Sequence, residues 1–175
     1  MNILTSALGC LVIPKKIFSD PRGSFQEAFK ESDYPFLPKM RQINIATSKP
    51  GVVRGFHLQH NRPQGKLIRV LSGHATACII DLRKGSPLYG HTESFQLTVE
   101  SHAIYVPPGY GNSYWTHTEV VYHYVCTEEY DFWSDHGVNP LDSEIDYPWK
   151  GSEIILSEKD KNLPLLKDFK PTAEV

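Results

Sequence analysis

The sequence lacks several features that would define other classes of protein. No apolar run reaches the roughly 18 residues that a membrane-spanning helix needs, so no membrane association is predicted. The net charge is only −2, which gives no reason to expect nucleic acid as a partner. The first fourteen residues lack a basic segment, so they predict a first strand and no signal peptide.

The three cysteines are too few and too widely spaced for a disulfide framework. Free thiols in a reducing cytoplasm are the simplest interpretation, and we predict a cytoplasmic protein. No internal repeat or low-complexity segment is present, and 175 residues suit one domain. The 13 prolines argue against long helices, so short helices are expected only at 30–34 and within the last 20 residues.

Short runs rich in β-branched and aromatic residues, separated by Gly, Pro and Asp, dominate the chain. Ten such runs at this spacing predict an all-β sandwich or barrel. The predicted strands are 11–17, 24–29, 42–48, 52–59, 66–72, 75–82, 94–99, 103–106, 113–116 and 120–127.

Apolar residues occupy both faces of several predicted strands, so each strand should be covered twice. In 66–72, Lys66 shares a face with Ile68 and Val70, and in 120–126 Tyr122 shares a face with Tyr124. The acidic, aromatic stretch after residue 127 is irregular, and we expect it to cover the mouth of the barrel.

Residues 50–69 are the part of the chain where polar groups concentrate. Five side chains that demand partners stand between apolar runs: Arg54, His57, Gln59, Gln64 and Lys66. A solvated loop would not need the apolar neighbours, and a plain core would not tolerate the polar groups. Two strands whose polar residues line a concave pocket satisfy both conditions.

Six motifs in this chain resemble those of one family, in the same order, over roughly residues 14–165. They are DPRGSFQE at 20–27, QIN at 42–44, GVVRGFH at 51–57, QGKL at 64–67, DLRKGSPLYG at 81–90 and LSEKD at 156–160. They resemble the signatures of the dTDP-4-dehydrorhamnose 3,5-epimerase family, nucleotide-sugar epimerases with a cupin-type jelly roll.

The resemblance implies an all-β, cupin-type jelly-roll β-barrel or sandwich with short peripheral helices, forming one domain over 1–175. It divides into N-terminal strands and a dimer arm (1–48), a barrel core (49–127) and a C-terminal flap and tail (128–175). It also implies a homodimer that pairs through its sheets and exchanges N-terminal strands. The implied substrate is a nucleoside-diphosphate 4-keto-6-deoxyhexose, epimerised without metal, nicotinamide or other cofactor.

The implied chemistry removes a proton beside the C4 ketone and returns one to the opposite face. His57 is the base, because imidazole titrates near neutral pH, and Asp160 holds it in a dyad. Lys66 stabilises the enolate oxygen. Tyr124 is the acid, as the first tyrosine of the pair in YVCTEEY, and Tyr122 is the reserve candidate.

Substrate binding is expected from residues with guanidinium, carboxylate, amide and phenol groups. A diphosphate favours guanidinium forks, and the resemblance places Arg22 and Glu27 on the substrate from a neighbouring subunit. The full predicted set is Arg22, Glu27, Gln42, Asn44, Arg54, Asn112 and Tyr130, with Tyr130 in the pocket wall.

The chain departs from the family where many members have a GxxHGF string. Here Asn112 replaces the histidine, and an amide cannot act as acid or base at neutral pH. A similar GNS string occurs in members acting on GDP-linked 4-keto-heptoses. The sequence therefore leaves the nucleotide open among dTDP, CDP and GDP, and the epimerised carbon open between C3, C5 and both.

Two other classes of protein compete with this interpretation. A metal-dependent cupin enzyme could use His57 and His60, but residues three apart in a regular strand point to opposite faces. A non-catalytic sugar-binding cupin would keep the arginines and lose the base, the dyad or the acid, whereas this chain keeps all three.

Overall fold

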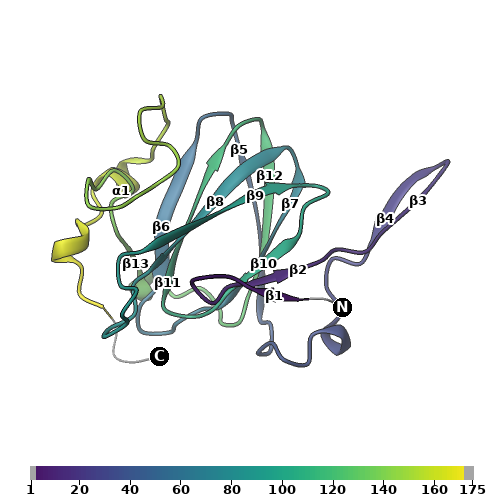
Figure 1. Cartoon of the computed structure of the whole chain (residues 1–175), viewed down its shortest axis with the longest axis horizontal. Coiled ribbons are helices and arrows are strands. Elements are labelled where there is room, and N and C mark those ends of the chain that lie inside the picture. The colour runs from purple at the N-terminus through teal and green to yellow at the C-terminus, as the bar shows by residue number, and fades with distance from the viewer. Residues whose placement is uncertain (1–2, 172–175) are drawn as a thin grey trace.

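The computed structural model describes residues 3–171 of the chain. Two antiparallel sheets face one another, one of six strands in the order β1-β2-β10-β7-β12-β5 and one of five in the order β13-β6-β11-β8-β9 (Figure 1). The larger sheet consists of β1 (Leu4–Thr5), β2 (Leu11–Ile13), β5 (Gln42–Ser48), β7 (Lys66–Ser72), β10 (Ala103–Val106) and β12 (Val120–Cys126). The smaller consists of β6 (Val53–Gln59), β8 (His74–Asp81), β9 (Thr92–Thr98), β11 (Tyr110–Thr116) and β13 (Asp135–Gly137).

The prediction of an all-β jelly-roll sandwich is thus confirmed. The helical elements are four residues or shorter: η1 (Glu31–Asp33), η2 (Phe132–Ser134), α1 (Glu158–Lys161) and η3 (Leu166–Asp168). Three of them lie where short helices were expected, and η2 lies outside those regions. Among residues 3–171, no helix has the length and apolar character that a membrane crossing demands.

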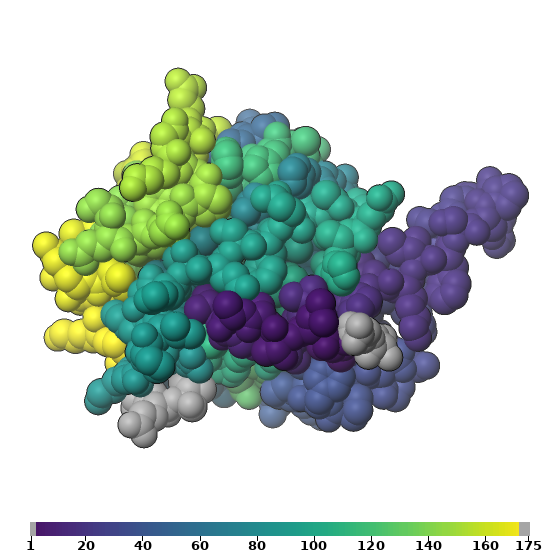
Figure 2. All heavy atoms as spheres, viewed as in Figure 1, coloured from purple at the N-terminus to yellow at the C-terminus, as the bar shows by residue number. Residues whose placement is uncertain are grey.

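The first two predicted strands have different boundaries in the structure. The run 11–17 is interrupted after Ile13, because Pro14 has no backbone N–H to continue the ladder. A separate hairpin follows, made of β3 (Ile17–Asp20) and β4 (Gly23–Gln26), so the prediction of one strand over 24–29 was too long. This hairpin projects away from the body of the molecule (Figures 1 and 2).

Three apolar clusters stabilise the sandwich and leave one end of its interior open. Between the sheets, Ile68, Val70 and Tyr122 pack against Ala77 and Ile79. The outer face of the smaller sheet is covered by the C-terminal segment, whose Trp149 is almost wholly buried. Part of the larger sheet is covered by a cluster that includes Tyr34. The remaining end of the interior, where polar residues replace apolar ones, holds the candidate site.

Candidate active site

The cavity at the open end has two connected lobes that share His57, Lys66, Tyr124 and Lys159. The outer lobe, about 350 Å³, is further lined by Gln42, Asn44, Gln59, Gln64, Tyr130 and Asp135. The inner lobe, about 250 Å³, is further lined by Arg54, Asn112, Tyr114, Tyr122, Ser157 and Asp160. Most of the predicted site residues therefore meet in one place.

His57 and Asp160 form a close pair although they are 103 positions apart in the chain. His57 Nε2 lies 2.6 Å from Asp160 Oδ1, and Asp160 is only 2% exposed. Burial by itself raises the pKa of Asp160, but the contact with His57 and hydrogen bonds from Ser157 and the Gly55 backbone outweigh it and lower the pKa. The carboxyl is therefore ionised and accepts the Nε2–H, which leaves the Nδ1 lone pair free to accept a proton.

Asp160 is held in place by the start of helix α1. Ser157 is the N-cap, and its hydroxyl accepts a hydrogen bond from the Asp160 backbone N–H at 3.1 Å. The LSEKD motif thus has a physical meaning. Its serine begins the short helix, and its aspartate faces the imidazole three residues later.

A β-bulge explains why Arg54 and His57 both line the inner lobe. Residues three apart in a regular strand point to opposite faces. Here the register between β6 and β11 shifts, so that Gly55 and Phe56 stand opposite Ser113 alone. Gly55 has a φ of +117°, and a Cβ there would lie 2.4 Å from the Asn112 carbonyl oxygen, so only glycine fits. The sequence contained this signal as the glycine in VRGFH.

Lys66 and Tyr124 reach the cavity from the opposite wall, on adjacent strands β7 and β12. The Lys66 ammonium lies 5.9 Å from the centroid of the Tyr124 ring. Burial lowers the pKa of Lys66, while Cys126 and Asp135 act to raise it. Burial raises the pKa of Tyr124 to about 12, so its phenol keeps its proton.

Three glutamine side chains hold the backbone at the rim of the outer lobe. The Gln42 amide oxygen accepts from the Tyr130 N–H at 2.7 Å, and the Gln59 oxygen accepts from the Asp131 N–H at 2.9 Å. The Gln64 amide donates to the Glu128 carbonyl at 2.8 Å. Gln42 also donates to Asn44 Oδ1 at 2.8 Å. These amides position segment 128–131, a function that the sequence analysis did not foresee.

Sequence reasoning also missed two charged residues that line the cavity. Lys159 forms an ion pair with Asp135, which also accepts a hydrogen bond from the Tyr130 hydroxyl at 2.9 Å. Lys159 lies within the LSEKD motif next to Asp160, and that adjacency was the available signal. Asp135 lies in the irregular stretch after residue 127, where no motif marked it.

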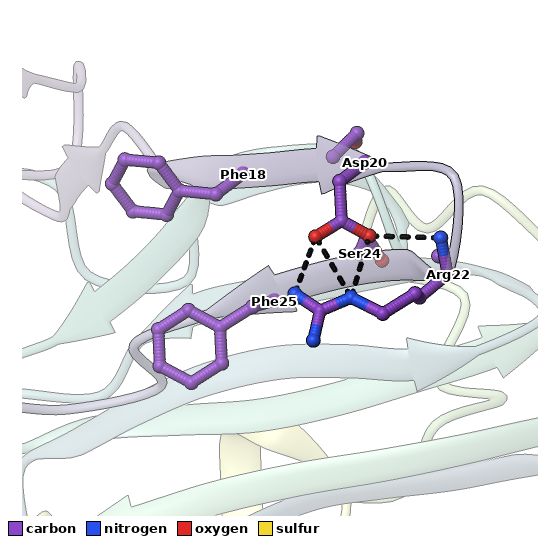
Figure 3. A pocket seen from close by; sticks show the side chains of 7 residues that line it. Phe18, Asp20, Arg22, Ser24 and Phe25 are labelled. Carbon is purple, nitrogen blue, oxygen red and sulfur yellow. Dashed lines mark hydrogen bonds and ion pairs between the residues drawn. The ribbon is translucent and has the colours of Figure 1, made fainter.

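Arg22 and Glu27 do not line this cavity. Arg22 is at the turn of the β3–β4 hairpin, where its guanidinium binds Asp20 at 2.6 Å and its side chain is 90% exposed. Figure 3 shows this pair beside Phe18 and Phe25, whose rings lie on the same face of the hairpin. Glu27 is exposed just beyond the hairpin.

The second histidine of the HxxH spacing is also outside the cavity. His60, just past the end of β6, lines a separate hollow and lies against His136, away from the cavity that His57 lines. Over residues 3–171, no three His, Cys, Asp or Glu side chains are grouped as a metal site would require.

The interior of this jelly roll holds a histidine–carboxylate pair that faces a lysine and a tyrosine across a polar cavity, an arrangement typical of an acid–base enzyme of the cupin type. The comparisons with known proteins specify which one. The family model for dTDP-4-dehydrorhamnose 3,5-epimerase matches residues 5–168. The chain belongs to the dTDP-4-dehydrorhamnose 3,5-epimerase family and is an isomerase of that family.

Individual relatives support this assignment over nearly the whole chain. A dTDP-4-dehydrorhamnose 3,5-epimerase from Methanothermobacter thermautotrophicus is 33% identical over 174 residues, covering 95% of this chain and 94% of that one. A dTDP-6-deoxy-D-glucose-3,5-epimerase from Legionella pneumophila, solved with dTDP-4-keto-L-rhamnose, superposes with a TM-score of 0.92 at 28% identity, covering 99% of both chains. ChmJ, a 3'-monoepimerase from Streptomyces bikiniensis solved with dTDP-quinovose, gives a TM-score of 0.84 at 30% identity and covers 91% and 84%.

Proposed function

We propose that this protein epimerises a nucleoside-diphosphate 4-keto-6-deoxy sugar, with His57 as the base and Tyr124 as the acid. The observation that carries the proposal is the 2.6 Å contact between His57 and Asp160 inside a cavity that also holds Lys66 and Tyr124. Nδ1 of His57 removes the proton from a carbon next to the C4 ketone. The electron pair moves to the C4 oxygen, and the Lys66 ammonium stabilises the resulting enolate.

Reprotonation on the other side of the sugar inverts the carbon. His57 comes from the five-stranded sheet and Tyr124 from the six-stranded sheet, so the two groups face the substrate from opposite walls. A raised pKa keeps the Tyr124 phenol protonated until it donates to the enolate carbon. Asp160 fixes the imidazole tautomer and stabilises the imidazolium that forms.

Substrate binding is assigned to the remaining polar residues of the two lobes. Arg54 donates through Nε to Ser48 at 3.0 Å, which holds its guanidinium at the edge of the inner lobe for an anionic or carbonyl oxygen. Asn44 and Tyr130 face the outer lobe, and Gln42 supports both of them. The relatives solved with ligands hold dTDP-linked molecules, so dTDP is the first nucleotide to test, before CDP and GDP.

A homodimer would bring Arg22 and Glu27 to a cavity. The hairpin that carries Arg22 stands clear of its own chain, with Phe18 57% and Phe25 65% exposed (Figure 2). Ile43 and Ile45, on the outer face of β5, are also exposed in one chain. We therefore assign residues 1–48 as the N-terminal strands and the dimer arm through which a second copy completes the site. They belong to a single domain with a 49–127 core and a 128–175 flap and tail, of which residues 1–2 and 172–175 lie outside the described part of the chain.

The nature of the substrate also suggests where the enzyme works. A nucleotide sugar is a cytoplasmic metabolite, and the three cysteines are buried as free thiols, which fits a reducing compartment. We accordingly place the activity in the cytoplasm.

Proton NMR in D2O tests the reaction directly. Purified protein is incubated with dTDP-, CDP- and GDP-4-keto-6-deoxyglucose, and loss of the C3 and C5 proton signals is followed. Deuterium is expected at C3, at C5 or at both with one nucleotide. If no carbon exchanges with any of the three substrates, the proposed function is wrong.

A further inference from the structure

Asn112 lines the inner lobe directly beside the proposed base, His57, where its side chain can contact the substrate. It lies on β11 with its Cα directly opposite that of His57 on β6, so the two side chains project from adjacent strands of one sheet. Lys66 projects from the other sheet. A substrate between the walls therefore presents one oxygen to Lys66 and another to Asn112.

The orientation of the Asn112 amide follows from its buried end. Asn112 Oδ1 is buried and has no hydrogen-bond partner in the described chain, and the same is true of the Tyr122 hydroxyl. The amide lies beside this phenol. Burial raises the pKa of Tyr122 well above its ordinary value, and the Asn112 amide acts to lower it. An amide lowers the pKa of a phenol through its N–H groups, so Nδ2 is the end of the amide nearer the phenol. Because Oδ1 is the buried atom, Nδ2 is also the atom left to face the cavity.

Tyr122 is well suited to hold that amide in place. It is fully buried, and its ring stacks on Tyr114 with centroids 3.9 Å apart and an interplanar angle of 11°. Tyr114 is itself fixed by a 3.0 Å hydrogen bond with Ser48. The Asn112 side chain is thus backed by a rigid aromatic pair and presents a neutral donor next to the catalytic base.

The two acidic carbons of the substrate differ in what they offer to such a donor. C3 carries a hydroxyl, which is a strong acceptor, whereas C5 carries a methyl group and the ring oxygen. Resting on the proposed function, we propose that Asn112 Nδ2 donates to the C3 hydroxyl. This contact places C3 beside His57, so that inversion occurs at C3 in preference to C5. Asn112 is then a specificity-determining residue and Tyr122 a positioning residue.

The proton balance at C3 is that of the general reaction. His57 Nδ1 takes the C3 proton, and the electron pair forms the C3–C4 double bond of the enolate. Collapse of the enolate takes a proton from Tyr124 on the opposite face, and solvent restores both residues. The product differs from the substrate only in the configuration at C3.

The ratio of C3 to C5 deuterium exchange tests this assignment, with the 4-keto-6-deoxyglucose that the wild type accepts. The wild type should exchange C3 faster than C5. Asn112→Ala should slow C3 exchange by about tenfold, the loss expected for one hydrogen bond, and should change C5 exchange much less. Tyr122→Phe keeps the stacked ring and removes only the hydroxyl, so it should lower the same ratio by about threefold.

A double variant separates positioning from independent effects. If Tyr122 acts through Asn112, adding Tyr122→Phe to Asn112→Ala should cause no further change. Tyr105→Phe is the matched control, because this tyrosine is buried in the cluster on the outer face of the larger sheet. Its ratio should equal that of the wild type.

Two results would overturn the inference while leaving the proposed function intact. One is faster exchange at C5 than at C3 in the wild type, and the other is an equal fall at both carbons in Asn112→Ala and Tyr122→Phe. A wild-type protein that exchanges neither carbon would overturn both proposals. Melting temperatures of all variants show whether a lost signal reflects loss of folding.

Discussion

The cavity and the β3–β4 hairpin were both marked by motifs, yet the structure holds them in opposite ways. His57 is fixed by a residue 103 positions away, whereas Arg22 is bonded to Asp20, two positions away. The cavity side chains are enclosed by two sheets, and the hairpin stands in solvent. Side chains that meet within one chain can be recognised as a site from that chain, whereas the exposed hairpin shows no contact that would define its role.

Loss of the base should have the largest effect and would test the cavity most severely. His57→Ala is expected to slow C3 and C5 exchange by about a thousandfold, since a general base contributes roughly 10²- to 10⁴-fold. His60→Ala is the matched control, because this histidine lies just past the end of the same strand and lines another hollow. Exchange in His57→Ala at a rate close to that of the wild type would remove the catalytic role of this residue.

Loss of the Lys66 charge should have the second-largest effect. Lys66→Met is expected to slow exchange by about a hundredfold, because one donor to an oxyanion is worth roughly 10²- to 10³-fold.

The pH dependence of exchange in the wild type also tests the role of the Lys66 charge. Burial lowers the pKa of Lys66, so the ammonium is lost as pH rises before it would be lost from a free lysine, at about 10.4. The exchange rate should therefore fall on the alkaline side below that pH.

Asp135→Asn sharpens this result, because Asp135 is one of the groups that raise the pKa of Lys66. Removing its charge should move the alkaline limb to still lower pH. Asp168→Asn, which changes an exposed carboxylate in another hollow, should leave the limb in place. If the alkaline fall in exchange rate occurs at the same pH in Asp135→Asn as in the wild type, then the titration of Lys66 does not cause that fall.

The same contrast explains how much could be predicted. Periodicity identified most strands, and the motifs indicated the residues that gather in the cavity. The glycine in VRGFH was the signal for a bulge, but its effect on Arg54 could not be predicted, since that effect depends on the partner strand β11. The roles of Gln59 and Gln64 were equally hidden, because an amide that binds backbone groups of a distant segment leaves no local pattern.

Substitution in the β3–β4 hairpin should have a smaller effect, and an intact hairpin on one subunit should restore activity at the site of the other. Arg22→Ala removes a guanidinium that would contact the substrate in a second copy, and we expect KM to rise about tenfold. In a mixture of Arg22→Ala and His57→Ala chains, half of the dimers are mixed, and each has one site with both residues intact. Exchange should then recover to about a quarter of the wild-type value at low substrate, given random assortment of copies.

The control for that mixture is an equal mixture of His57→Ala and Asp160→Asn, two residues that belong to the same site. Every mixed dimer then has a defect in each of its sites, so no recovery is expected. Recovery in this control, or none in the Arg22 mixture although the copies have exchanged, would show that the hairpin serves its own chain or none.

The smallest effect is expected at the rim of the outer lobe, segment 128–131. This segment is less enclosed than the cavity walls but better supported than the β3–β4 hairpin. Gln59→Leu removes the acceptor for the Asp131 N–H, but Gln42 and Gln64 still hold the same segment. One of three parallel contacts should cost about a threefold rise in KM with kcat nearly unchanged, because the rim orients the substrate and takes no part in proton transfer. Replacing all three glutamines should cost far more than three times that free energy, since the last contact then has no support. Strictly additive changes in free energy across the three sites would mean that the rim is rigid without them, and that the segment belongs to the enclosed cavity.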